Sequence, residues 1–247
     1  MKKVKILILA LFMLFIISGC FNKERPISNN LSDSTSVKSK PSNVKQKPST
    51  EKKVIIKPKD VQIKEINGFV LVSSLDKNIV IDLKYATTDN FTKKIIYPNN
   101  VCVLRKNTAQ KLVKANSQLK KLGYEIKVWD AYRPIYVQQI FWNIVKDSRF
   151  VANPNNGGSI HNKGCAVDVT LVDINGNELN MPSKFDDFSY KAYRTNSKQT
   201  SEAKKNVDLL TKCMVDNGFT TIDTEWWHFD DVDSKNYKIA DIDLKLF

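Results

Sequence analysis

The chain has 247 residues, 39 basic and 26 acidic side chains, and a formal net charge of +13. Residues 1–60 carry 13 of the basic and 4 of the acidic residues, so +9 of the charge lies there and only +4 in residues 61–247. No aromatic residues interleave with the basic ones of residues 22–60, which argues against nucleic acid as a partner. An anionic membrane or wall surface suits the basic N-terminal part better.

Residues 1–20 have the layout of a secretory signal peptide, with a basic start, an apolar run from Ile6 to Ile17 and small residues before Cys20. The run Ile17-Ser18-Gly19-Cys20 resembles a bacterial lipobox, which implies cleavage before Cys20 and a lipid on that cysteine. The alternative is an uncleaved transmembrane anchor, although the apolar run is shorter than the ~20 residues of a span. Both interpretations place the rest of the chain outside the cytoplasm, tethered to the bacterial cell membrane.

Residues 21–60 are rich in Ser, Asn, Lys, Pro and Thr, and their composition predicts a disordered basic stalk. Residues 61–247 have the size of one domain with a core of its own. Once Cys20 is lipidated, three cysteines remain, and an odd number cannot all pair within the chain. One disulfide is possible, but we expect three free thiols, at Cys102, Cys165 and Cys213. No Cys-x-x-Cys pair is present, so a cysteine zinc site is not expected.

The first half of the domain predicts strands, then a helix, then a strand. Residues 69–72 and 79–85 are runs rich in β-branched residues that predict short strands. Apolar residues at helical spacing predict a helix over 107–122, which Gly123 would end. Residues 124–128 then alternate as a half-buried strand.

That strand leads into Trp129-Asp130-Ala131-Tyr132-Arg133-Pro134. Pro134 suits the first position of a helix, where its missing N–H costs nothing, and the apolar residues 135–146 predict a well-buried helix. Asp130 and Arg133 therefore fall on a strand-to-helix turn, a usual place for functional groups.

Residues 165–173 predict a strand in which Asp168 lies on the face opposite Cys165 and Val167, beside small neighbours. Asn175-Gly176 predicts a hairpin turn. A helix over 201–217 and a last strand over 224–229 follow. This order predicts an α+β domain with a small, mostly antiparallel sheet and flanking helices.

The sequence has two histidines, and each lies beside carboxylates. His161 precedes Asp168 by seven residues, and Glu225 precedes His228 by three. Two imidazoles and a carboxylate are the donor set of a catalytic zinc site, which keeps a fourth position for water. Each histidine could instead be structural, and Asp168 could cap a turn; Cys165 could supply a thiolate, but its strand parity opposes Asp168.

One geometric condition applies to this pattern. Residues three apart on a flat strand face opposite sides, so Glu225 and His228 cannot both face a metal from a regular strand. A turn, bulge or strand end near Trp226-Trp227 must bring them together.

The pattern Ser159-x-His161-x-x-Gly164-x-Ala166-x-Asp168, with Glu225-x-Trp227-His228 downstream, resembles the zinc D,D-peptidase family that acts on bacterial cell-wall peptides. Residues 82–92, residues 129–134 and the doubled tryptophan are similar to the D-alanyl-D-alanine dipeptidase branch, known for its VanX members. The resemblance covers most of residues 65–235.

This resemblance implies that His161, Asp168 and His228 bind one zinc ion per chain, and that Glu225 is the general base. It also implies that Arg133 stabilises the negative charge on the scissile carbonyl oxygen, a role suited to a permanently charged donor. Two alternatives stay open. Glu225 could orient an imidazole, and Arg133 could merely pair with Asp130 across the turn.

The resemblance further assigns substrate binding to three residues. Asp186 lies where the dipeptidases keep an acid for the free ammonium group, with Asp187 as an adjacent competitor. Ser159 and Tyr85 match positions that hold the carboxylate end of the substrate or line the pocket. An N-acylated substrate should then bind less well, because the buried carboxylate would lose its partner.

The implied function is zinc-dependent hydrolysis of D-alanyl-D-alanine outside the membrane, in cell-wall peptide turnover. Two alternatives are a D,D-carboxypeptidase on longer peptidoglycan stem peptides and a non-catalytic lipoprotein that binds wall peptides. Because a lipid-anchored protein could not reach a cytoplasmic precursor pool, turnover is a better expectation than direct glycopeptide resistance.

Overall fold

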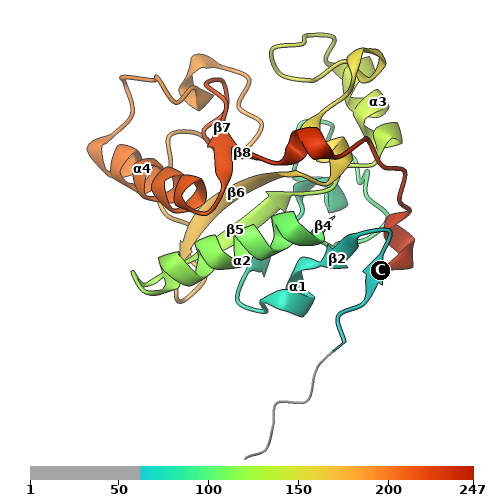
Figure 1. Cartoon of the computed structure of the whole chain (residues 1–247). Coiled ribbons are helices and arrows are strands. Elements are labelled where there is room, and N and C mark those ends of the chain that lie inside the picture. Colours follow the sequence, from blue (N-terminus) through green and yellow to red (C-terminus); the bar gives the residue numbers. More distant parts are fainter. Residues whose placement is uncertain (1–61) are drawn as a thin grey trace, which may run out of the picture. The chain divides into compact units, whose positions relative to one another are not determined.

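Short strands and helices alternate along residues 62–247, the part of the chain that the structure, a computed structural model, describes (Figure 1). The strands are β1 (Glu65–Ile66), β2 (Phe69–Leu71), β3 (Val80–Ile81), β4 (Val103–Arg105), β5 (Tyr124–Asp130), β6 (Ala166–Asp173), β7 (Phe219–Thr221) and β8 (His228–Asp231). The helices are α1 (Val72–Leu75), α2 (Lys106–Lys120), α3 (Ile135–Ile144) and α4 (Ser201–Asp216). The predicted signal peptide (1–20), its Cys20 and the predicted stalk (21–60) lie outside the described residues.

The strands form two sheets. A three-stranded sheet has the order β1-β2-β4, and a five-stranded sheet has the order β3-β5-β6-β8-β7. All neighbouring pairs are antiparallel except β3 and β5, which are parallel. The predicted class, α+β with a mostly antiparallel sheet, is confirmed.

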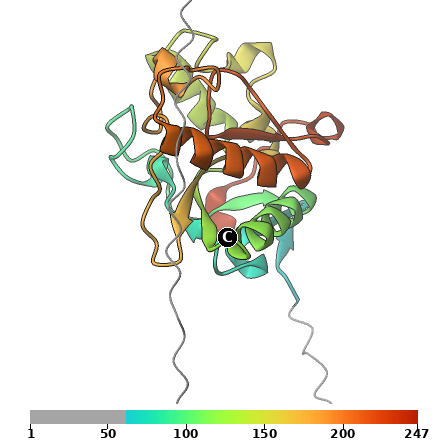
Figure 2. The same ribbon diagram turned by 90° about the vertical axis from the view of Figure 1, so that its left-hand side faces the viewer.

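Helices cover one face of the five-stranded sheet. Figure 2 shows α2 and α4 side by side on this face, where they pack against each other and against β5, β6 and β7. The β6 residues Val167, Val169 and Leu171 point to this side and are completely buried. Ala166, Asp168 and Thr170 have the opposite parity, so the other face of the sheet carries the polar groups.

Three sequence predictions were wrong in detail. The run 79–85 is a strand only at Val80–Ile81, because a 3-10 turn, Lys84–Ala86, follows. The helix over 135–146 ends at Ile144, and it is buried on one side only, since Tyr136 and Ile144 are about half exposed. The strand expected over 224–229 is β8, which starts only at His228, and β7 is a further short strand that was not predicted.

The hairpin after β6 forms only in part. Gly176, at φ +84°, makes the expected turn, and its N–H donates to the carbonyl of Asp173. The returning chain then pairs through a single bridge between Val172 and Glu178 and continues as an irregular segment across the polar face of the sheet.

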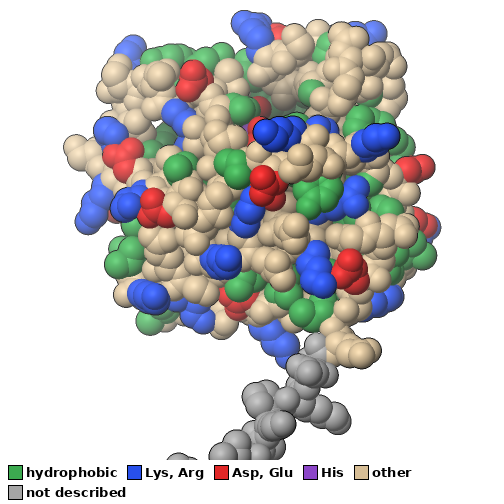
Figure 3. All heavy atoms as spheres, in the orientation of Figure 1, with side chains coloured by type: hydrophobic (Ala, Val, Ile, Leu, Met, Phe, Trp, Pro, Cys, Tyr) green, Lys and Arg blue, Asp and Glu red, His purple; other side chains and the backbone are tan. Residues whose placement is uncertain are grey.

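Cys102, Cys165 and Cys213 are buried free thiols, so the expectation of three unpaired cysteines is confirmed for the described residues. On the face shown in Figure 3, lysine and arginine side chains are interspersed with acidic ones, in line with the small net charge of residues 61–247. Within residues 62–247, no helix has both the length and the apolar character that a membrane span requires.

Candidate active site

Two of the three predicted metal ligands face each other across neighbouring strands. Asp168 on β6 pairs directly with His228 on β8, so their side chains project from the same face of the sheet. His161 lies in a 3-10 turn, Ile160–Lys163, just before β6. Ser159 caps this turn by accepting from the N–H of His161, and Gly164 ends it in a left-handed conformation, at φ +73°.

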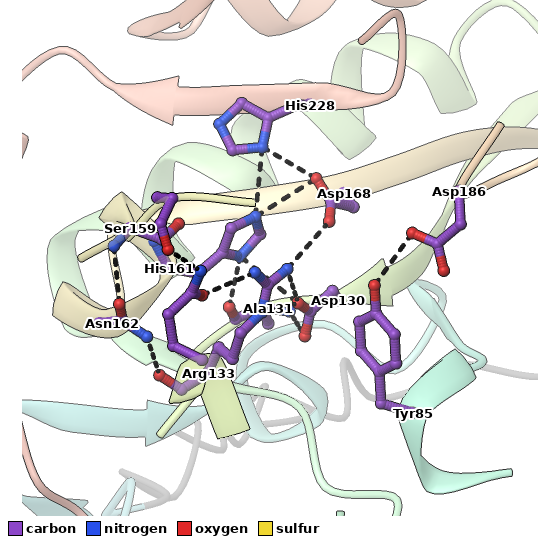
Figure 4. A network of polar contacts seen from close by, with 12 residues as sticks. Tyr85, Asp130, Ala131, Arg133, Ser159, His161, Asn162, Asp168, Asp186 and His228 are labelled. Carbon is purple, nitrogen blue, oxygen red and sulfur yellow. Dashed lines mark hydrogen bonds and ion pairs between the residues drawn. The ribbon is translucent and has the colours of Figure 1, made fainter. Parts of the chain in front are cut away.

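The donor atoms of His161, Asp168 and His228 form a small triangle (Figure 4). His161 Nε2 lies 3.2 Å from His228 Nδ1 and 3.3 Å from Asp168 Oδ1, and His228 Nδ1 lies 3.0 Å from the same oxygen. Ligands bound at ~2.1 Å in a tetrahedral zinc site are ~3.4 Å apart. The three side chains are therefore spaced and composed to hold a zinc-like ion, and the predicted trio is brought together.

The second nitrogen of each ring has its own partner. His161 Nδ1 is 2.7 Å from the carbonyl oxygen of Ala131, and His228 Nε2 is 2.9 Å from Asp230 Oδ1. These contacts leave His161 Nε2 and His228 Nδ1 for the metal. Asp230 was missed by the sequence analysis, although residues two apart on a strand share a face and His228-x-Asp230 follows that spacing.

All three candidate ligands are buried, with exposed fractions of 1% for His161, 2% for Asp168 and 7% for His228. Burial alone would raise the pKa of the Asp168 carboxyl, but the neighbouring imidazoles hold it well below its usual range. Burial likewise opposes charge on His228, yet its contacts with Asp168 and Asp230 raise its pKa to about 10. A metal ion must displace a proton there, so metal binding will depend on pH.

Glu225 stands beside this cluster because the chain bends just before β8, as the sequence required. Its Oε2 lies 3.9 Å from His228 Nδ1, and burial raises the pKa of its carboxyl to about 7. A group with that pKa suits general base catalysis near neutral pH. The imidazoles are oriented by Asp230 and Ala131, which argues against the alternative that Glu225 orients one of them.

Arg194 holds the bend that carries Glu225. Its guanidinium donates to the carbonyls of Ile222 (3.0 Å) and His228 (2.9 Å), which lie on either side of Glu225, and to Thr211 Oγ1 on α4 (2.9 Å). It also stacks 4.6 Å from the centre of the Phe229 ring. No sequence pattern points to Arg194, because its partners are mostly backbone carbonyls.

Arg133 pairs with Asp130 across the turn and also lies beside the metal cluster; its role toward the scissile carbonyl oxygen stays a prediction. Its Nε and Nη2 donate to Asp130 Oδ2 at 2.9 and 2.6 Å, and its Nη2 also lies 3.8 Å from Asp168 Oδ2. A bulge between Val128 and Asp130 sets Asp130 opposite Asp168, which aims the turn at the metal cluster. Although burial lowers the pKa of the guanidinium, the charge of Asp130 raises it, so Arg133 stays charged.

The predicted substrate-binding residues Tyr85, Ser159 and Asp186 line the same cavity as the metal cluster. Figure 4 shows Asp186 and Tyr85 on one side of the cluster and Ser159 on the other. The Tyr85 hydroxyl donates to Asp186 Oδ1 at 3.0 Å, and burial raises the pKa of the Asp186 carboxyl to about 7. Asp187, the competitor, instead accepts from the N–H of Ser189 and does not line the cavity.

The cavity has a volume of about 230 Å³. It is smaller than the ~300–1,000 Å³ pockets that take drug-sized ligands. Polar residues of the cluster share its lining with aromatic ones: Tyr85, Phe91, Arg133, Phe141, Ser159, His161, Asp168, Asp186, Phe188, Glu225, Trp227 and His228. Its size suits a small substrate with charged ends.

Comparison with known families gives a clear match: residues 65–243 match the Peptidase M15 family, described as D-ala-D-ala dipeptidase. The chain belongs to this family. Its members are metallopeptidases, so the protein is assigned to the enzymes, as predicted. The predicted roles of the individual side chains stay predictions.

Curated relatives agree with this membership. The D-alanyl-D-alanine dipeptidase of Escherichia coli K12 is 34% identical over 162 residues, which are 66% of this chain and 83% of the relative. The dipeptidase of Enterococcus faecalis V583 is 30% identical over 190 residues, covering 68% of this chain and 93% of the relative.

Solved structures give weaker likenesses. The D,D-dipeptidase VanXYg in complex with a D-Ala-D-Ala phosphinate analogue overlaps at a TM-score of 0.35, with 20% identity over 65% of this chain and 60% of its own. The LdcB LD-carboxypeptidase overlaps at 0.42, with 18% identity over 70% and 75%. The family assignment rests on the sequence matches.

Proposed function

We propose that the protein is a zinc-dependent D-alanyl-D-alanine dipeptidase that acts outside the cytoplasmic membrane, in cell-wall peptide turnover. One observation carries the catalytic part of this proposal. His161, Asp168 and His228 form a zinc-sized triangle inside a small cavity that Glu225 and Arg133 also line. Curated relatives that are about one-third identical carry the name of this activity, which supports the choice of substrate.

The cavity fits a short substrate with one charge at each end. Asp186 lies on one side of the metal cluster and can accept from the ammonium group of a dipeptide (Figure 4). Ser159 lies on the other side. Its Oγ accepts from the N–H of His161, so its hydroxyl hydrogen is free to donate to the carboxylate of the dipeptide. The peptide bond between these ends then lies over Asp168 and Arg133.

His161, Asp168 and His228 would hold the zinc ion, which would act as a Lewis acid on the scissile carbonyl and on water. Glu225 takes the proton of the attacking water and later delivers it to the leaving amine. Arg133 offers a fixed positive charge, backed by Asp130, to the oxygen that becomes negative. Burial keeps bulk water away, which strengthens these interactions.

Zinc content and turnover together test this proposal. The purified protein should bind one zinc ion per chain and hydrolyse D-alanyl-D-alanine, and Glu225→Gln should bind zinc equally but lose at least about 10²-fold in kcat. Wild-type turnover no higher than that of the variant would instead support a non-catalytic peptide-binding protein. A preference for acylated stem peptides over the free dipeptide would support the carboxypeptidase alternative.

The proposed location rests on the sequence of residues 1–20 alone. Attachment through a lipid on Cys20 predicts that the protein sediments with membranes and incorporates a labelled fatty acid, and that Cys20→Ser abolishes this labelling. Recovery of the unprocessed wild-type protein in the cytosolic fraction would contradict this location.

A further inference from the structure

The helix α3 buries a polar side chain, that of Gln138. It is completely buried, alongside the buried apolar side chains of Val137 and Phe141. Both polar ends of its amide are paired: Oε1 accepts from Arg133 Nη1 at 2.9 Å, and Nε2 donates to the carbonyl of Ala152 at 2.7 Å. A leucine of similar volume would fill the same space, so the reason for an amide lies in these two partners.

Asp130 alone does not fix the guanidinium of Arg133. Its Oδ2 accepts from both Nε and Nη2, while its Oδ1 is occupied by the Tyr97 hydroxyl and the N–H of Ala131. Two bonds to two oxygens hold a guanidinium in one orientation, whereas two bonds that meet at one oxygen let it rock about that oxygen. A third contact is needed to fix the direction, and Gln138 supplies it at Nη1.

Aromatic rings cover the guanidinium without setting its direction. The ring centres of Tyr85 and Phe141 lie 5.6 and 5.0 Å from the central carbon of the group. Such contacts attract the positive charge but do not distinguish one donor from another. They therefore leave the guanidinium free to turn in its own plane.

The backbone of Arg133 is held firmly by the turn that carries His161. The N–H of Arg133 donates to the carbonyl of His161 at 3.1 Å, and its carbonyl accepts from Asn162 Nδ2 at 2.8 Å. The base of the side chain is thus fixed relative to a metal ligand. The direction of its tip depends on Asp130 and Gln138.

The direction of the guanidinium decides which donor faces the metal cluster. Of the five N–H groups of Arg133, three are used by Asp130 and Gln138, which leaves one on each Nη nitrogen. Nη2 lies 3.8 Å from Asp168 Oδ2, on the side of the cluster (Figure 4). Rocking about Asp130 would move the free donor of Nη2 towards or away from an oxygen bound there.

The second partner of Gln138 belongs to the wall of the active site. Ala152 lines the active-site cavity. It lies in the segment 145–159, which follows α3 and leads to the turn of His161. Since one amide binds both groups, Gln138 ties the direction of Arg133 to the position of this wall.

We propose that Gln138 is a positioning residue for the reaction, which holds the guanidinium of Arg133 so that Nη2 faces the oxygen that becomes negative. The proposal rests on the function proposed above, because it assumes that Arg133 meets this oxygen. An amide is suited to the task, since it accepts a hydrogen bond without adding charge. Asp130 already balances the charge of Arg133, and a second carboxylate would weaken the attraction for the developing negative charge.

Turnover of D-alanyl-D-alanine by Gln138→Leu is the first test. The variant fills the space and has no acceptor for Arg133. We expect kcat to fall about 10- to 100-fold while KM changes less than about twofold, because the oxygen becomes negative only in the transition state. The control is Gln139→Leu, since Gln139 bonds to Asn143 at the surface of α3, and it should match wild type. Equal kcat in the two variants, or a rise in KM at unchanged kcat, would overturn the proposal.

A binding comparison separates this role from general support of the fold. A phosphinate analogue of D-alanyl-D-alanine carries a negative oxygen in place of the scissile carbonyl oxygen, whereas the dipeptide does not. In zinc-loaded Glu225→Gln, Gln138→Leu should weaken phosphinate binding about tenfold and dipeptide binding less than about twofold, as measured by calorimetry. Equal weakening of both ligands would overturn the proposal, because it would make Gln138 a purely structural residue.

NMR of the guanidinium tests the orientation without any substrate. In the zinc-loaded protein the Nη signals of Arg133, identified by their loss in Arg133→Lys, should be separate, because hydrogen bonds slow rotation about the Cζ–Nη bonds. In Gln138→Leu the Nη1 signals should merge, and separate signals would overturn the proposal. Failure of the wild type to hydrolyse the dipeptide would overturn the proposed function instead, and merged signals would still show that Gln138 holds Arg133.

A second variant keeps the test open if Gln138→Leu does not fold. Gln138→Glu retains an acceptor for Arg133, so the Nη1 signals should stay separate. Its added charge opposes the negative oxygen, so phosphinate binding should weaken about tenfold relative to dipeptide binding. An unchanged ratio of the two affinities would overturn the proposal.

Discussion

Asp230 provides a sharp test of how the metal site is built. Its Oδ1 lies 2.9 Å from His228 Nε2, on the side of the ring away from Asp168. A carboxylate in this position fixes the ring orientation and makes the other nitrogen a better ligand. Asp230→Ala removes both the acceptor and the charge, whereas Asp230→Asn keeps an acceptor and loses the charge.

The expected loss follows from the contact that is removed. Changing such a partner of a zinc-bound histidine costs about 10- to 100-fold in metal affinity, or ~1.4–2.7 kcal/mol. Asp230→Ala should lie near the upper end and Asp230→Asn near the lower end. Competition with a zinc chelator of known affinity, at fixed pH, measures the effect without reference to catalysis.

Asp233→Ala is the matched control. It removes a carboxylate three residues further on, which pairs with Lys111 and does not touch the histidines. If Asp230→Ala binds zinc as tightly as this control, then the contact with His228 does not support the metal, and the assignment of His228 Nδ1 as the ligand atom loses its basis.

Three further predictions concern the surrounding structure. Arg194→Gln leaves buried carbonyls unpaired, so the melting temperature should fall by about 5–15 °C, and Lys204→Gln, at an exposed position of α4, is the control. The kcat at 25 °C should fall too, and an unchanged kcat would contradict the idea that Arg194 positions Glu225. Burial raises the pKa of Asp186 from 3.8 to about 7, so the folded state loses stability as pH rises through this range. Asp186→Asn should therefore be more stable than wild type at pH 8 and lose that advantage near pH 4, which urea unfolding at the two pH values measures. Gly164→Ala would drive a Cβ into the Phe69 ring and should lower the free energy of unfolding in urea by about 2–4 kcal/mol, whereas Gly176→Ala, with open space around it, should lower it by about 1 kcal/mol. Equal losses would contradict the close packing at Gly164.

The sequence predicted the regular elements where a periodic pattern extends over many residues. The helix expected at 107–122 is α2, and the one expected at 201–217 is α4, because amphipathic patterns of this length specify both the element and its buried face. The parity of residues 165–173 likewise placed Asp168 on the polar face. Short apolar runs were less informative, since the run 79–85 contains the residues of a strand but finds a partner strand for only two of them.

The candidate site was predicted as a set of residues and not as a geometry. The motifs named His161, Asp168 and His228, and the need for a bend at Trp226-Trp227 followed from strand parity alone. What the sequence could not show is how the bend is held, because the partners of Arg194 are carbonyls of distant segments.

The direct pairing of Asp168 with His228 has a consequence for the order in which the protein opens. Two ligands on neighbouring strands make the ion a crosslink between β6 and β8, and β7 is attached to the sheet only through β8. Chelation should therefore loosen the C-terminal third before the rest. Amide hydrogen exchange of β7 and β8 should accelerate when zinc is removed, while that of α2 changes little; uniform acceleration would instead mean that the domain opens as a single unit.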